Sequence, residues 1–140
     1  ALLLTFALIL LAGCGKSLTN KSTGDTMKIS LDVDTSSNYV WSYSIMDSNV
    51  IDLKSEEFLT PADDETLDSD AQVLTFKAFN EGESEIILSY MNNDSGKTKY
   101  DITYVITVDA NKNIKVKEKS GKYSKKLPNP VIYTESNDEK

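Results

Sequence analysis

The chain has 140 residues, a formal net charge of −7 and no histidine or arginine. These absences remove the usual general base, the usual zinc ligand and bidentate recognition of phosphate, and the acidic charge disfavours binding to nucleic acid or anionic lipid. The remaining carboxylates, lysines and hydroxyls form no catalytic motif, so the sequence predicts a protein that is not an enzyme and uses no cofactor or metal.

The first thirteen residues are apolar apart from Thr5 and are followed by Cys14, the single cysteine of the chain. A short apolar run that ends in small residues is typical of a secretory signal, and Leu-Ala-Gly-Cys is similar to the bacterial lipobox, whose cysteine is lipidated. The run is too short for a membrane span, which needs about 20 apolar residues. We expect residues 1–13 to be a signal peptide that lacks its charged start, and Cys14 to anchor the protein outside the cytoplasm. The alternative is an apolar segment that happens to end in cysteine.

Residues 14–26 are mainly polar and predict a flexible tether, and residues 27–121 predict one folded domain without a disulfide. Apolar and polar residues alternate over residues 27–34 and 39–46, which predicts two β-strands. In the second strand the rings of Tyr39, Trp41 and Tyr43 lie on one face.

A polar turn joins these two strands, with the sequence Asp34-Thr35-Ser36-Ser37-Asn38. Asp, Thr and Ser side chains bond to nearby backbone groups, so the turn is expected to be stiff. Asn38 is the non-glycine residue best able to adopt a positive φ.

The rest of the chain also alternates. A short extended piece begins at residue 50, an acidic loop is expected over residues 54–71 with Phe58 among its apolar anchors, and further strands are expected near 73–79, 86–90, 100–108 and 114–116. About seven strands with regular turn signals and no helix predict an immunoglobulin-like β-sandwich, with a barrel as the alternative. Residues 122–140 are expected to be a polar tail, in which 131–133 could add an edge strand.

The turn and its second strand resemble the first binding loop of the chagasin family, Asn-Pro-Thr-Thr-Gly-Tyr/Phe-x-Trp. Tyr39 and Trp41 match this motif, and Ser36 and Ser37 keep the hydroxyls of its two threonines. Thr35 replaces the proline, which leaves the loop more conformational entropy to lose on binding. The pattern Leu74-x-Phe76-x-Ala78, Gly82, Ile86-x-Leu88-x-Tyr90 also resembles the second half of the family's domain.

The resemblance implies a reversible inhibitor whose partner is a papain-like cysteine protease, with three loops at one end of the sandwich plugging the active-site cleft. The protease-binding loop is expected to comprise Asp34, Thr35, Ser36, Ser37, Asn38 and Tyr39. The flanking loops are expected at Asp68, Ser69, Asp70 and Ala71, in place of a Gly-rich loop, and at Asn92, Asn93 and Asp94, in place of Arg-Pro-Trp. Loss of the rigid aromatic anchor is expected to weaken binding by about one to two orders of magnitude. Acidic residues in these loops favour a basic target.

The missing flanking motifs also favour an alternative: a surface-anchored immunoglobulin-like binding module whose partner is not a protease. A third possibility is a structural lipoprotein without a dedicated site. The carboxylates of residues 63–70 raise the possibility of calcium binding, but their spacing fits no known loop motif, and a solvated acidic surface is favoured. The protein is expected to be a monomer that meets the membrane only through its lipid anchor.

Overall fold

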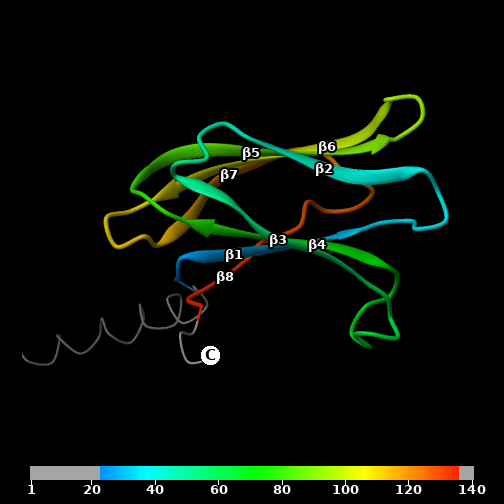
Figure 1. The fold of residues 1–140 in the computed structure, drawn as a ribbon, viewed down its shortest axis with the longest axis horizontal. Helices are drawn as coiled ribbons and strands as arrows, with labels where there is room; N and C mark the ends of the chain where they lie inside the picture. Colours follow the sequence, from blue (N-terminus) through cyan, green and yellow to red (C-terminus); the bar gives the residue numbers. More distant parts are fainter. Residues whose placement is uncertain (1–22, 136–140) are drawn as a thin grey trace, which may run out of the picture.

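The computed structural model describes residues 23–135, which form eight strands in two four-stranded antiparallel sheets that pack face to face (Figure 1). The first sheet has the order β3 (Ile51–Leu59), β4 (Ala71–Ala78), β1 (Thr26–Asp32) and β8 (Val131–Tyr133). The second has the order β2 (Tyr39–Ile45), β5 (Gly82–Asn92), β6 (Thr98–Val108) and β7 (Ile114–Lys122). The predicted immunoglobulin-like β-sandwich is confirmed. No helix within residues 23–135 is long and apolar enough to cross a membrane.

The core lies between the two sheets and follows from the alternation of side chains along each strand. On β1, Met27 and Ile29 are fully buried and lie opposite Phe76 and Leu74 of β4. The second sheet contributes the buried side chains Ile86, Leu88, Ile102, Tyr104 and Ile106. Because every second residue of a strand faces the partner sheet, these inward positions are readable from the sequence.

Strand β3 is longer than predicted, and the acidic loop is correspondingly shorter, since it occupies only residues 60–70. The charged residues of β3 are tolerated because this strand lies at the edge of its sheet. A bulge between Leu53 and Ser55 shifts the alternation, so that Glu56 and Phe58 lie opposite the inward residues Leu74 and Gln72 of β4. At this sheet edge the side chain of Phe58 is nevertheless 50% exposed, so Phe58 is not the anchor that was expected.

The expectation of a polar tail after residue 121 is wrong as far as the structure describes this segment, but the edge strand that residues 131–133 could add is present. Tyr123, Leu127 and Ile132 pack against the core, and the hydroxyl of Tyr104 donates a hydrogen bond to the Pro128 carbonyl at 2.7 Å. The segment then pairs with the start of β1 as β8. It thus passes from the second sheet to the first (Figure 1), and its few apolar residues hold it there despite the lysines and prolines around them.

The chain enters the sandwich before β1, earlier than the expected end of the tether at residue 26. Gly24 accepts a hydrogen bond from Ile114 N at 2.9 Å, and Asp25 accepts one from Ala78 N at 2.9 Å. A Cβ at Gly24 would lie 2.0 Å from the carbonyl carbon of Tyr133, so only glycine allows the chain to pass β8 this closely. The entry of the chain is thereby fixed at one end of the molecule.

Candidate functional site

Three connections between strands lie together at the other end of the sandwich (Figure 1). They are the central loop (residues 33–38, between β1 and β2), the acidic loop (60–70, between β3 and β4) and the hairpin loop (93–97, between β5 and β6). The central loop lies between the other two and bonds to both. Val33 N donates to the Asp70 carbonyl at 3.1 Å, and Asn93 N donates to the Asn38 carbonyl at 2.9 Å.

Two carboxylates strengthen these connections. The hydroxyl of Thr35 donates to Asp70 Oδ2 at 2.6 Å, and the amide of Asn38 donates to Asp94 Oδ2 at 2.6 Å. Hydrogen bonds to an ionised acceptor are stronger than neutral ones. Asp70 and Asp94 therefore fasten the central loop from opposite sides, and the three loops form one connected surface.

The central loop also satisfies its own polar groups. Asp34 Oδ1 accepts hydrogen bonds from the backbone N–H of Ser36 at 3.0 Å and from its hydroxyl at 2.6 Å. Ser37 N donates to the Asp34 carbonyl at 3.0 Å, and Ser37 Oγ accepts from Tyr39 N at 3.1 Å. These side chains occupy the backbone groups that a turn would otherwise leave to water. The self-bonded turn expected from the sequence is present.

Asn38 does not use its ability to adopt a positive φ. Among the described residues, Lys112 is the one non-glycine residue with a positive φ, of 66°. Asn38 instead leads directly into β2, with its side chain bonded to Asp94 and its carbonyl to Asn93. The residue serves as a link to the hairpin loop and does not replace a glycine in backbone conformation.

Five aromatic rings lie beneath the central loop, on β2, β5, β6 and the segment after β7: Tyr39, Trp41, Tyr90, Tyr100 and Tyr123. The centroid of Trp41 lies 5.0 Å from that of Tyr90 and 5.8 Å from that of Tyr123. Tyr39 stacks on Tyr90 at 5.2 Å. Tyr43, which the sequence places with Tyr39 and Trp41, lies farther along β2 against Phe76 and is 43% exposed.

The polar atoms of these rings bond to the backbone that leads into the central loop. Asp34 N donates to the Tyr90 hydroxyl at 3.0 Å, and Asp32 N donates to the Tyr123 hydroxyl at 2.8 Å. Trp41 Nε1 donates to the Asp32 carbonyl at 2.9 Å. Buried Tyr and Trp side chains usually find such partners, and here the partners are successive groups at the end of β1. The ring cluster therefore fixes where the loop begins.

The flanking residues expected from the sequence divide into exposed positions and positions that support the loops from below. Asp68, Ser69, Asn93 and Asp94 are exposed beside the central loop. Ala71 does not belong with them, because it is buried as the first residue of β4 and pairs with Asp32. Asn92 ends β5, and its side-chain oxygen accepts hydrogen bonds from Asp94 N at 2.8 Å and Ser95 N at 2.9 Å, so it shapes the hairpin loop from below.

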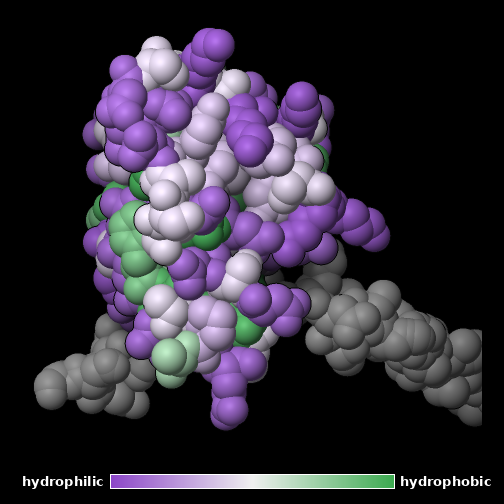
Figure 2. Space-filling view, turned by 90° about the vertical axis from the view of Figure 1, so that its right-hand side faces the viewer, coloured by the Kyte–Doolittle hydropathy of each residue, from purple (hydrophilic) through white to green (hydrophobic). Residues whose placement is uncertain are grey.

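The loop end is mostly hydrophilic, with apolar surface confined mainly to one side (Figure 2). Its carboxylates outnumber its lysines; they belong to Asp34, Asp63, Asp64, Glu65, Asp68, Asp70 and Asp94. Lys99 Nζ lies 5.4 Å from the ring centroid of Tyr39 and 5.7 Å from that of Tyr100. Within residues 23–135, no three His, Cys, Asp or Glu side chains gather in a way that could hold a metal ion.

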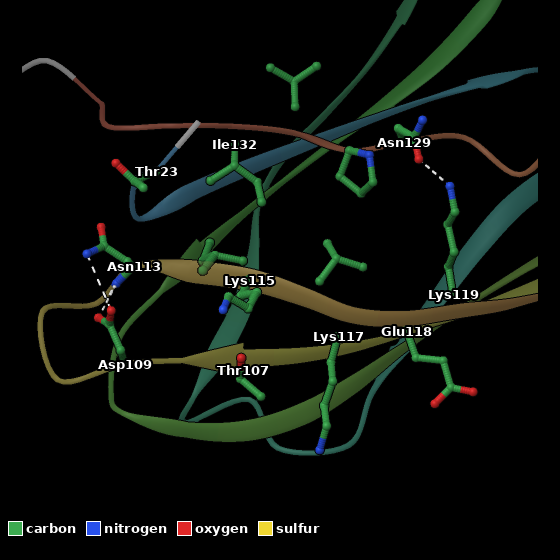
Figure 3. Close-up of a pocket in the computed structure, with 14 residues that line it drawn as sticks. Thr23, Thr107, Asp109, Asn113, Lys115, Lys117, Glu118, Lys119, Asn129 and Ile132 are labelled. Carbon is green, nitrogen blue, oxygen red and sulfur yellow. Dashed lines mark hydrogen bonds between the residues drawn. The ribbon is translucent and has the colours of Figure 1, made fainter. Parts of the chain in front are cut away.

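A groove lies away from this end, between β7 and residues 129–132, which lead into β8 (Figure 3). Its apolar lining includes Ile114, Val116 and Ile132, and the turn residues Asp109 and Asn113 close one end of it. None of the loop residues described above lines it. This groove is therefore not part of the candidate site that the three loops form.

Three residues of this region have places that their sequence patterns do not predict. The composition around Tyr123 predicts a tail, and that around Phe58 predicts a loop. Gln72 occupies an inward position of β4 between the buried residues Ala71 and Val73, and its side chain is fully buried. The sequence does show that Gln72 is a polar residue in register with the inward side chains Leu74 and Phe76. Such a residue is expected to have a hydrogen-bond partner inside the domain.

These features define an immunoglobulin-like sandwich that presents three connected loops at one end. Residues 20–108 match the family described as chagasin family peptidase inhibitor I42. The match covers more than half of the chain and includes all three loops, and the chain belongs to this family of peptidase inhibitors.

One solved structure similar to the chain is the crystal structure of the cysteine protease inhibitor EhICP2 from Entamoeba histolytica. The two share 17% sequence identity with a TM-score of 0.49, over 60% of this chain and 77% of that chain. No curated protein shows significant sequence similarity to the chain.

The turn makes a testable electrostatic prediction. Hydrogen bonds from the Ser36 hydroxyl and N–H, helped by the charge of Lys99, hold the pKa of Asp34 below its ordinary value, which is near 3.9. Because these bonds favour the charged carboxylate, the turn keeps them at neutral pH and loses them as the pH falls through the lowered pKa. In an NMR titration of the side-chain carboxyl carbons, Asp34 should titrate below an ordinary aspartate, and Ser36→Ala should raise its midpoint.

Asp109 is the internal control for this titration. Its pKa is also lowered, chiefly by the backbone N–H of Asn113 and then that of Asn111, in a turn at the opposite end of the sandwich. Ser36→Ala should leave its midpoint unchanged. A midpoint for Asp34 at or above the ordinary value would contradict the turn geometry.

Proposed function

We propose that this protein is a reversible inhibitor of papain-like cysteine proteases, in which the central loop enters the active-site cleft and the other two loops contact its rims. The observation that carries the proposal is the central loop itself, which projects between its neighbours and is bonded to both. Membership in a family of peptidase inhibitors supports it. Inhibition requires no covalent step, since a fixed loop only has to fill the cleft.

The fixed shape of the loop is what gives such a contact its affinity. Ordering a flexible side chain on binding costs about 0.5–1.5 kcal/mol, and here Thr35 and Asn38 are already ordered by Asp70 and Asp94. The Thr35 bond also offsets part of the stiffness that a proline at this position would have provided. The bond from Ser37 N to the Asp34 carbonyl holds the backbone in a turn, which does not present an extended peptide for cleavage.

Phe58 extends the proposed contact surface. Of the large hydrophobic side chains that are exposed within residues 23–135, Phe58 is the one that adjoins a loop at this end, as the penultimate residue of β3. The hairpin loop offers no aromatic anchor to a partner. An exposed Phe beside the acidic loop supplies apolar area there, of the kind that dominates binding energy at interfaces.

We further propose that the protein is held outside a bacterial cell by lipid on Cys14, which lies outside the described residues. The support is the sequence, an apolar run that ends in Leu-Ala-Gly-Cys. Labelled palmitate should be incorporated into the protein in bacteria and should be absent from Cys14→Ser. Equal labelling of both proteins would contradict a lipid on this residue.

The function is tested by inhibition of papain and cathepsin L. The protein should inhibit reversibly, and Ser36→Trp should weaken inhibition about a hundredfold or more, a loss of about 2.7 kcal/mol, because an indole at the tip of the loop no longer fits the cleft. Asn111→Trp is the matched control: its backbone N–H bonds to Asp109 Oδ1 as that of Ser36 bonds to Asp34 Oδ1, but it lies at the opposite end. This control should inhibit normally.

A folded protein that inhibits neither enzyme at about 50 μM, where a complex of only about −6 kcal/mol would form, would overturn the proposal. The alternative is a binding module with a partner that is not a protease. The observation that favours it is the polar hairpin loop, with Asn93 and Asp94 exposed where the family's aromatic anchor would stand.

The proposed contact at Phe58 has its own prediction. Phe58→Ser should raise the inhibition constant about tenfold, a loss of about 1.4 kcal/mol, because apolar area is removed from the interface. Phe79→Ser is the matched control, since Phe79 is similarly exposed, at 44%, but follows β4 at the opposite end. Equal inhibition by both variants would place Phe58 outside the contact.

A further inference from the structure

The fully buried side chain of Gln72 lies where β2 lacks a neighbouring strand. Strand β2 is at the edge of the second sheet and pairs only with β5. On its other side, Trp41 N donates to Gln72 Oε1 at 3.0 Å, and Gln72 Nε2 donates to the Trp41 carbonyl at 2.9 Å. One side-chain amide thus makes the pair of hydrogen bonds that a strand residue would make. The link joins the two sheets.

Glu56 fixes the orientation of this amide. Gln72 Nε2 also donates to Glu56 Oε2, so both hydrogens of the NH₂ group have acceptors. If the amide were reversed, its oxygen would face the Trp41 carbonyl and the Glu56 carboxylate, while its NH₂ group would face the Trp41 N–H. All three contacts would then be unfavourable. The bulge in β3 makes this arrangement possible, because it turns Glu56 toward the inner side of the sheet.

Gln72 lies at the base of the central loop, between the two strands that carry it. Its backbone pairs with Leu31 near the end of β1, and its side chain bonds to Trp41 near the start of β2. It also follows the acidic loop directly in the chain, two residues after Asp70. One residue therefore connects the incoming strand, the outgoing strand and one neighbouring loop.

We propose that Gln72 is a positioning residue for the central loop, and that it sets the loop's place relative to the acidic loop without touching a partner. The inference rests on the proposed function of the central loop. Without the amide, the outer edge of β2 has no partner and can move across the sandwich. The loop it carries then loses its fixed position, and a partner must restore it on binding.

The test compares Gln72→Met, which keeps the volume of the side chain but not its polar atoms, with Thr75→Val. Thr75 is a mostly buried polar residue of the same strand, but it is out of register with the inward residues Gln72 and Leu74. Under conditions where both variants are folded, amide hydrogen exchange over residues 36–41 should be faster in Gln72→Met than in Thr75→Val. The inhibition constant should rise about tenfold in Gln72→Met and stay unchanged in Thr75→Val.

Glu56 provides a second pair of variants, which decides the matter if Gln72→Met does not fold. Glu56→Gln keeps an acceptor for the Gln72 amide and should exchange as the unaltered protein does, whereas Glu56→Ala should exchange faster over residues 36–41. Unchanged exchange in Glu56→Ala, or equal exchange and inhibition in Gln72→Met and Thr75→Val, would overturn the inference. Should the unaltered protein inhibit no protease, the proposed function fails, while the exchange comparison still decides whether Gln72 positions the loop.

Discussion

The loop end of this protein depends on the contact between the aromatic cluster and the last backbone groups of β1. Tyr90, Trp41 and Tyr123 come from different parts of the chain, and each gives a polar atom to residues 32–34. The same rings bury apolar area against one another, so the energy that packs the core also fixes the start of the loop. A loop supported in this way can be short and polar without being mobile, because its position is set by the core below it.

The acidic side chains at the loop end have two different roles, which the composition of the chain does not distinguish. Asp34, Asp70 and Asp94 accept hydrogen bonds that hold the central loop, and those bonds connect three loops that are far apart in the sequence. Asp68 is exposed and contributes to the acidic field around the loops. Such a field favours association with a basic surface, an effect that weakens as salt is added. Aspartate side chains thus both hold the central loop in place and make the surface around it acidic.

Much of the fold was predictable because strand alternation is a local property. The inward residues of β1 and β4 and the self-bonded turn after Asp34 follow from short stretches of sequence. What could not be predicted depends on distant partners. The glutamates of β3 predict a loop, because the sequence does not show that this strand lies at the edge of a sheet. Tyr123 is predicted to lie in the tail, because the residues that it contacts lie on other strands. Asp70 and Asp94 were chosen by resemblance, but their bonds to the central loop are set by the strand order.

The way the chain passes Gly24 has a mechanical consequence. Here the start of β1 and the end of β8 meet, and β1 then runs for seven residues, about 23 Å at the usual rise per residue, before the three loops begin. Whatever is attached before residue 23 or after residue 135 departs from the pole opposite the loops. A surface or a second domain joined there would lie at the opposite end from the loops and would leave them accessible.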